Sequence, residues 1–289
     1  MVWRINLNKA DEQYGTLGLD LLKNGVWKMN ERTGKRCLTT TTKVFEYDVG
    51  KGEFPMITTR QVFPKMALAE PVGYWQGLSS AKDFRVLGTH TWNSNANKTK
   101  AWLSNENRSG EDDMGRVYGW FGHNFGGVNQ FEKVYNNLRM GIDDRGEIIT
   151  YWKPDEFDFG CLRPCLHSLQ FNLLGDTLHM TASQRSTDVP LGLVSNMPQC
   201  YEMLALMARV TGNKAGLVTH VLNQPHIYED QLELFELQMQ RTPITGVRPK
   251  LEISDTIQVW DDIMDIQNMK VFTVTGYESH TRIDFPFSE

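Results

Sequence analysis

The sequence predicts an α+β fold built on one large sheet, within a single domain over residues 1–289. Helical and strand-like segments interleave along the chain without the strict strand–helix–strand alternation of a parallel α/β protein. There is no internal repeat, low-complexity tract or proline- and serine-rich linker that would divide the chain. A hydrophobic content of 40% with 11% aromatic residues is sufficient for one sizeable core.

Each element is predicted from a local pattern. Helical spacing of apolar residues predicts helices over 11–23, 64–77, 130–140, 197–210 and 229–240. β-Branched and aromatic residues predict strands over 37–49, 147–152, 166–173, 178–184, 217–222, 250–253 and 271–274. We expect the first helix to be capped near Asp11 and the fourth to stop at Gly212. The polar stretch over 82–109 is expected to be irregular.

Charge and cysteine content narrow the function classes. A formal net charge of −5 argues against nucleic acid as the main partner, but one nucleotide needs only a few arginines. The C-x₃-C pair at Cys161 and Cys165 has no second pair to complete a zinc site, so we expect no metal. No apolar run reaches the roughly twenty residues of a membrane helix. Residues 1–6 carry no apolar signal core, and we expect a cytoplasmic protein, in the host cytoplasm if the source is viral, without a membrane partner.

The stretch from Pro164 to Asn196 carries the strongest chemical pattern. Cys165 follows a proline beside strand-like sequence. A second cluster comes about twenty residues later, with polar residues at Gln184, Arg185, Ser186, Asp188 and Asn196 and with Leu191 and Gly192 between them. A thiol is a nucleophile, a guanidinium suits phosphate, and a carboxamide offers a donor and an acceptor to a planar heterocycle. The pattern therefore suggests covalent chemistry on a nucleotide base. A buried, inert cysteine is the alternative, which we retain for Cys37, Cys161 and Cys200.

These residues resemble the core signature of the thymidylate synthase family, Pro-Cys followed by Gln-Arg-Ser-x-Asp-x-x-x-Gly-x-x-x-Asn and a later His-x-Tyr. Similar segments occur in the same order around Arg32, Arg60, Glu70, Trp92, Tyr118, His226, Tyr228 and Tyr277. The resemblance implies a twisted mixed sheet, flanked by helices, whose face packs against the same face of a second subunit in a homodimer.

The resemblance also implies the reaction. A one-carbon unit passes from 5,10-methylenetetrahydrofolate to C5 of a pyrimidine deoxynucleoside monophosphate, with dUMP to dTMP as the first expectation. Two alternatives stay open. One is 5-hydroxymethylation of dUMP or dCMP, and the other is an inactive relative that binds a nucleotide or RNA.

Site roles follow from the same resemblance. The catalytic residues are expected to be Cys165, Glu70, Arg185, Asn196 and Tyr118. The nucleotide is expected to contact Arg32, Arg145, Gln184, Ser186, Asp188, Asn196, His226 and Tyr228. The folate is expected to contact Arg60, Trp92, Asp188, Leu191, Gly192 and Tyr277.

Residue chemistry supports several of these roles and leaves alternatives. A carboxylate in apolar company, such as Glu70, has a raised pKa and can move protons near neutrality. Arg185 near Cys165 would lower the pKa of the thiol. Asn196 suits uracil O4 and N3–H but could instead cap a helix. Asp188 could cap a loop, whereas His226 and Tyr228 alternate and should share one strand face.

Four departures from the family pattern bear on the product. Leu166 stands where the family has histidine, Gly146 where it has a second arginine, and Asn95 where it has a second tryptophan. The chain ends in Pro286-Phe287-Ser288-Glu289 instead of small apolar residues. Less complete exclusion of water would favour the hydroxymethyl product.

Overall fold

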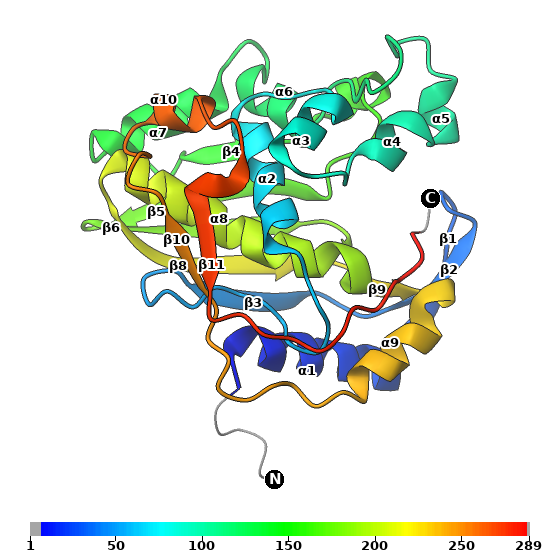
Figure 1. Cartoon of the computed structure of the whole chain (residues 1–289). Helices are drawn as coiled ribbons and strands as arrows, with labels where there is room; N and C mark the ends of the chain where they lie inside the picture. The colour runs from blue at the N-terminus through cyan, green and yellow to red at the C-terminus, as the bar shows by residue number, and fades with distance from the viewer. Residues whose placement is uncertain (1–6, 288–289) are drawn as a thin grey trace.

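A computed structural model describes residues 7–287, and the expectations about residues 1–6 and 288–289 lie outside that range. The strands of the largest sheet form the middle of the molecule, the hairpin of β1 (Val26–Asn30) and β2 (Lys35–Thr39) lies at its edge, and helices pack around the strands (Figure 1). The five-stranded and the four-stranded sheets are both mixed, because each contains parallel and antiparallel pairs. The predicted α+β class with a mixed sheet and flanking helices is confirmed.

The five-stranded sheet has the order β3-β8-β6-β5-β4. Its strands are β3 (Lys43–Asp48), β8 (Lys214–Leu222), β6 (Thr177–Gln184), β5 (Leu166–Leu174) and β4 (Ile148–Thr150). Strands β6 and β8 are parallel, and the other pairs are antiparallel. Residues of β6 alternate strictly, with Leu178, Met180 and Ala182 buried and Thr181 among the half-buried positions between them. One face therefore forms the core, while the opposite face remains partly exposed.

The second sheet continues the first across a break. Its order is β1 (Val26–Asn30), β2 (Lys35–Thr39), β9 (Pro225–Tyr228) and β7 (Thr187–Asp188). Strand β7 follows β6 after Arg185 and Ser186, and the parallel neighbour β9 follows β8 after Asn223 and Gln224. The chain thus presents Arg185 and Ser186 where the two sheets part.

The five predicted helices are confirmed. They are α1 (Lys9–Asn24), α2 (Pro64–Trp75), α7 (Gln130–Arg139), α8 (Val194–Thr211) and α9 (Leu232–Met239). Helix α8 runs along the sheet through the centre of the molecule (Figure 1), and most of its side chains are buried. It ends at Gly212, whose φ of 74° is left-handed, as predicted. A 3₁₀ turn, Glu229–Gln231, forms the start of the segment predicted as the last helix.

The C-terminal strands were also predicted, whereas the shortest elements were not. Strands β10 (Lys250–Ile253) and β11 (Phe272–Thr275) form a separate antiparallel pair. Helices α6 (Tyr118–His123) and α10 (Trp260–Met264) contain too few residues to show a helical period in the sequence.

Two predictions about the first fifty residues were wrong. The cap of α1 is Asn8, whose Oδ1 accepts from the Asp11 amide at 2.8 Å. The Asp11 carboxylate instead accepts from the amide and hydroxyl of Thr58. The segment 37–49 is two strands in different sheets, because the chain leaves the ladder at 40–42.

The segment 82–109 is also more ordered than predicted. It contains α3 (Ala81–Leu87), α4 (Asn93–Asn97) and α5 (Lys100–Leu103). Its polar groups bond to a carboxylate that follows the segment: Asp112 accepts from both Arg85 Nη atoms, at 2.8 and 2.6 Å, and from Asn97 at 2.8 Å. Polar composition therefore reflected an internal hydrogen-bond cluster, which the sequence pattern could not distinguish from a solvated loop. Within residues 7–287, no helix combines the length and apolar character needed to span a bilayer.

Candidate active site

Cys165 differs from the other cysteines in its surroundings. It immediately precedes β5 and is half-buried, whereas Cys37, Cys161 and Cys200 are buried. Burial raises the pKa of Cys37 to about 11 and that of Cys161 to about 12. These buried thiols stay protonated at neutral pH, as expected for structural cysteines.

The backbone of Cys165 is held on both sides. Its amide donates to the Tyr118 hydroxyl at 2.8 Å, and its carbonyl accepts from the Arg185 amide at 2.8 Å. Burial raises the pKa of the Cys165 thiol, and the positive charges of Arg185 and Arg32 oppose that rise. Arg185 therefore acts on the thiol pKa in the expected direction, but the pKa stays above its usual value because desolvation outweighs the arginines.

Two adjoining cavities meet at the break between the sheets. The larger, of about 920 Å³, is lined by Cys165 and Tyr228 among others, and the smaller, of about 320 Å³, by His226. Asn30, Arg32, Arg185 and Ser186 line both. The predicted nucleophile and the predicted phosphate groups therefore share one concave surface.

Arg185 is fixed in orientation by the loop that carries Cys165. Its Nε donates to the Pro164 carbonyl at 2.9 Å, and its Nη2 donates to the Arg163 carbonyl at 3.1 Å. Its guanidinium carbon lies 5.2 Å from the centre of the Trp152 ring. These contacts hold the guanidinium plane without pairing it to a carboxylate, so its charge remains available to an anion.

Behind Cys165, hydrogen bonds join the predicted proton-transfer carboxylate to the predicted base-reading amide. The Tyr74 hydroxyl donates to Glu70 Oε1 at 2.8 Å, and Gln199 Nε2 donates to Glu70 Oε2 at 2.6 Å. Gln199 Oε1 then accepts from Asn196 Nδ2 at 2.8 Å. Tyr118 stacks on Tyr74 with ring centres 4.5 Å apart, which connects this group to Cys165.

The chain of hydrogen bonds continues into the core. Gln184 Nε2 donates to Asn196 Oδ1 at 3.0 Å, and Gln184 Oε1 lies 2.9 Å from His220 Nε2. His220 Nδ1 in turn lies 2.9 Å from the Tyr47 hydroxyl. Burial lowers the pKa of His220 to about 3, so the ring is neutral, with Nε2 as donor and Nδ1 as acceptor. These hydrogen bonds fix the orientation of the side-chain amides of Gln184, Asn196 and Gln199.

Glu70 has the electrostatics predicted for it. Burial raises the pKa of the Glu70 carboxyl, and the hydrogen bonds from Tyr74 and Gln199 reduce that rise. A carboxyl with a raised pKa can exchange a proton closer to neutral pH than an exposed one.

Asn196 is not a helix cap. It lies inside the first turn of α8, where Leu193 occupies the capping position without a side-chain hydrogen bond. Gln184 and Gln199 use one acceptor site and one donor hydrogen of its carboxamide. One N–H and one lone pair remain, which is what reading a uracil O4 and N3–H requires.

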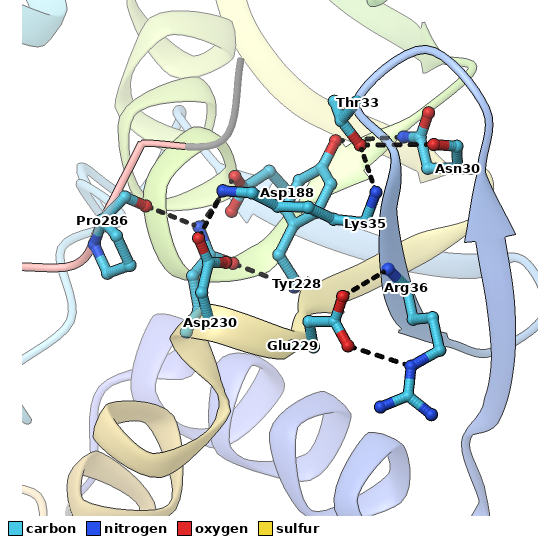
Figure 2. Close-up of polar contacts among 10 residues, drawn as sticks. Asn30, Thr33, Lys35, Arg36, Asp188, Tyr228, Glu229, Asp230 and Pro286 are labelled. Carbon is cyan, nitrogen blue, oxygen red and sulfur yellow. Dashed lines mark hydrogen bonds and ion pairs between the residues drawn. The ribbon is translucent and has the colours of Figure 1, made fainter.

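Asp188 does cap a loop. Its Oδ1 accepts from the Leu191 amide at 3.0 Å at the start of the π-helical turn η2 (Val189–Leu193), which leads into α8. Its Oδ2 accepts from Gln231, whose amide also donates to the Pro286 carbonyl at 3.2 Å. Figure 2 shows this contact between the Asp188 region and the C-terminal segment. Burial raises the pKa of Asp188.

His226 and Tyr228 lie on the same side of β9, as predicted, with ring centres 5.1 Å apart. The Tyr228 hydroxyl accepts from Asn30 Nδ2 at 3.1 Å (Figure 2). Asn30 ends β1, and the exposed turn after it carries Arg32. The β1–β2 hairpin therefore supplies an arginine beside the predicted sugar-binding pair.

The residues predicted to contact folate lie outside the lining of the two cavities. Arg60 is buried, donates to the Pro190 carbonyl and has the Phe285 ring 5.2 Å from its guanidinium carbon. Tyr277 accepts from the Val62 amide at 3.0 Å and so anchors the C-terminal segment. Trp92 is buried against Tyr74 and Tyr118.

Leu191 and Gly192 belong to η2, next to Asn196. A Cβ at Gly192 would lie 3.5 Å from Asn196 Oδ1, so a larger side chain here would compete with a ligand over that amide. Glycine at this position therefore keeps the approach to Asn196 open.

One residue predicted to contact the nucleotide lies away from the cavities, and two polar residues of the site were not predicted from the sequence. Arg145 is exposed on the loop before β4 and lines neither cavity. Gln199 was missed, although its position one helical turn after Asn196 indicates a shared face. Arg163, in the larger cavity, was also missed. Among residues 7–287, no group of three or more His, Cys, Asp or Glu residues is arranged to hold a metal ion.

The fold and the site bring together a half-buried thiol, a cavity lined by arginines and an amide–carboxylate hydrogen-bond network, an arrangement typical of an enzyme active site. A family model described as thymidylate synthase matches residues 12–289. The chain belongs to the thymidylate synthase family.

Named relatives agree with this assignment. A thymidylate synthase from Haemophilus influenzae (strain PittEE) is 51% identical over 283 residues, covering 96% of this chain and 99% of the relative. One from Colwellia psychrerythraea is 52% identical over 274 residues, covering 93% and 96%. One from Psychromonas ingrahamii is 50% identical over 283 residues, covering 96% and 99%.

Proposed function

We propose that this chain methylates dUMP at C5 to give dTMP, with 5,10-methylenetetrahydrofolate as the one-carbon donor. The observation that carries the proposal is the position of Cys165 in one cavity with Arg32, Arg185 and Ser186. A nucleotide held there by its phosphate would have its base near a thiol.

The proposed nucleotide contacts divide by chemical group. Arg32, Arg185 and Ser186 bind the phosphate, because two guanidinium groups and a hydroxyl supply donors for its oxygens. His226 and Tyr228 bind the sugar hydroxyl. Asn196 reads the base, with Gln184 as the residue that orients its carboxamide.

The proposed chemistry begins with covalent addition. The Cys165 thiolate adds to C6 of the pyrimidine, and the electron pair moves to C5 and O4, which makes C5 a carbon nucleophile. The positive charges of Arg185 and Arg32 favour the thiolate and oppose the effect of burial on the thiol. Glu70, hydrogen-bonded through Gln199 to Asn196, accepts and returns protons around the base. Tyr118 positions Cys165 through the backbone amide.

The folate supplies the methylene and a hydride, and leaves as dihydrofolate. The larger cavity has room for the pyrimidine base beside Cys165, with Trp102, Phe157 and Leu162 as apolar walls. Arg60 Nε is buried without a hydrogen-bond partner among the described residues. Arg60, Trp92, Asp188, Leu191, Gly192 and Tyr277 are proposed to surround the folate.

We also propose that residues 1–289 form one catalytic domain that works as a cytoplasmic homodimer. The partly exposed face of the five-stranded sheet, opposite α8, offers a surface for a second copy. Exposed Val44 and Ile148, at 55% and 42%, add apolar area on the outer strands. Arg145 would then reach the phosphate of the partner subunit. Neither nucleic acid nor a membrane is required.

Hydroxymethylation is the competing outcome, and one observation favours it. Asn95 lines the same cavity as Cys165 and is a polar group that can hold water. Mass analysis of the product after incubation with dUMP or dCMP and methylenetetrahydrofolate separates the reactions. We expect dTMP from dUMP and little turnover of dCMP. A product that carries an additional oxygen would replace methylation with hydroxymethylation.

A further inference from the structure

We propose that Arg163 is a further substrate-binding residue that contacts the nucleotide phosphate from within the same chain. This inference rests on the proposed function, because it concerns the phosphate of the proposed substrate. Arg163 has none of the site roles that the family resemblance implied.

The position of Arg163 brings its side chain to the site. It is two residues before Cys165, is exposed, and lines the larger cavity together with Arg32 and Arg185. Its guanidinium carbon lies 5.2 Å from the centre of the Phe157 ring. The ring limits where the side chain can point, which lowers the entropy lost when it binds an anion.

No acidic group among residues 7–287 compensates the charge of Arg163 by an ion pair. In the part of the protein that the structure describes, its guanidinium has no hydrogen bond and no ion pair. By contrast, the cavity-lining Arg185 uses two of its donors on the carbonyls of Pro164 and Arg163. An exposed arginine facing an aromatic wall with all five donors available is suited to an incoming oxyanion.

Arg163 and Arg185 are also mechanically linked. The hydrogen bond from Arg185 Nη2 to the Arg163 carbonyl joins the Cys165 loop to the break between β6 and β7. Movement of one arginine on phosphate binding therefore transmits to the loop that carries the nucleophile. Phosphate contact through Arg163 would help to hold the Cys165 thiol in position beside the base.

The overall charge of the cavity matches a phosphate. Its charged lining residues are Arg32, Lys100, Arg163 and Arg185, with Asp158 as the acidic exception. A phosphate monoester carries about −1.5 to −2 charges at neutral pH and has three acceptor oxygens, so a third guanidinium can add hydrogen bonds that the first two do not make. Arg145 lines neither cavity, so Arg163 is the third arginine that one chain itself provides.

The test compares dUMP with deoxyuridine, which lacks the phosphate, by equilibrium binding to Arg163→Ala and the unaltered protein. We expect the variant to bind dUMP roughly 10- to 100-fold more weakly, the range for loss of a charge-assisted contact. Binding of deoxyuridine should not change. Arg163→Lys should recover part of the loss, because an ammonium keeps the charge without the planar fork.

Arg139→Ala is the matched control, since it removes an exposed arginine that lines neither cavity. Equal weakening of dUMP and deoxyuridine in Arg163→Ala would overturn the phosphate contact. A rise only in the KM for the folate would overturn it in favour of a folate carboxylate. Because binding needs no turnover, failure of the proposed reaction would appear separately, as unaltered protein that binds dUMP without forming product.

Discussion

Gln199 hydrogen-bonds to Glu70 and Asn196 at the same time, at 2.6 Å from Nε2 to the carboxylate and 2.8 Å from Oε1 to the amide. The proposed proton-transfer group and the proposed base-reading group are therefore joined through one side chain. An amide has distinct donor and acceptor ends, so this bridge also fixes which way Asn196 faces. Two variants can separate these effects.

Gln199→Leu should disturb both ends of the bridge. Loss of its hydrogen bond raises the pKa of Glu70 further, so the acid limb of the kcat profile should move to higher pH. Asn196 loses one orienting partner, and kcat/KM for dUMP should fall by about 10-fold. Tyr74→Phe is the control, because it removes a bond to Glu70 alone. Tyr74→Phe should move the acid limb without changing the preference for dUMP over dCMP, whereas Gln199→Leu should weaken that preference. If the two variants changed the preference equally, the bridging role of Gln199 would be contradicted.

Glu70→Gln should lower kcat by about 10²- to 10⁴-fold and remove the acid limb assigned to this carboxyl. Stability gives a second readout. Since folding raises the pKa of Glu70, the folded state binds this proton more tightly than the unfolded state. Its contribution to stability is therefore present at low pH and is lost as pH rises from the unfolded pKa through the folded pKa.

The thermal unfolding midpoint of the unaltered protein should consequently fall relative to Glu70→Gln as pH rises through that window. Asp188 and Glu202 also have raised pKa values, but the unaltered protein and Glu70→Gln both retain these residues. The difference between the two unfolding midpoints therefore reports on Glu70. A difference in midpoint that does not change with pH would show that folding leaves the pKa of Glu70 unshifted.

Asn196→Asp should shift preference from dUMP toward dCMP. A carboxyl group can pair with N3 and N4 of cytosine when a proton is shared, whereas the carboxamide suits uracil. The measurement is kcat/KM for each nucleotide. Because Asn196 lies within α8 and does not cap it, the substitution should cost little helix stability. An unchanged ratio of the two kcat/KM values would remove Asn196 from base reading.

Thr181→Glu should weaken the proposed dimer. Thr181 is half-buried on the sheet face opposite the buried residues of β6, so a carboxylate there would meet its own copy or be desolvated in a face-to-face dimer. Sedimentation should show a dimer for the unaltered protein and a larger monomer fraction for the variant. Thr16→Glu, on the exposed side of α1, is the control. A monomer at micromolar concentration in the unaltered protein would contradict the proposal and would leave Arg145 without a role at the phosphate.

The sequence was sufficient for long, regular elements and for residues in a recognisable motif. Helices such as α8 and strands such as β6 carry many periodic side chains, and their prediction held. The 82–109 segment did not, because its polar side chains bond to Asp112 instead of to water. A solvated loop and a segment whose polar groups bond to a protein carboxylate have the same pattern of polar residues in the sequence.

At the site, the sequence predicted which residues come together but not how burial and nearby charges would balance in their effect on each pKa. Arg185 lies near Cys165 as expected, yet the effect of burial on the thiol exceeds that of the charge. Burial depends on how β5, α6 and the sheet break come together, which no local pattern contains. Gln199 was missed for a related reason: its meaning comes from a carboxylate 129 positions away in the chain.

Dihydrofolate formation is the most direct test of the central claim that Cys165 starts methylation of dUMP. The unaltered protein, given dUMP and methylenetetrahydrofolate, should show the absorbance rise of dihydrofolate in equal amount to dTMP. Cys165→Ser should bind dUMP but give no rise, because a hydroxyl is far less ionised than a thiol. Cys161→Ser, at a neighbouring buried cysteine, should retain the activity. Turnover of dUMP without dihydrofolate, or substantial dihydrofolate formation by Cys165→Ser, would contradict the account.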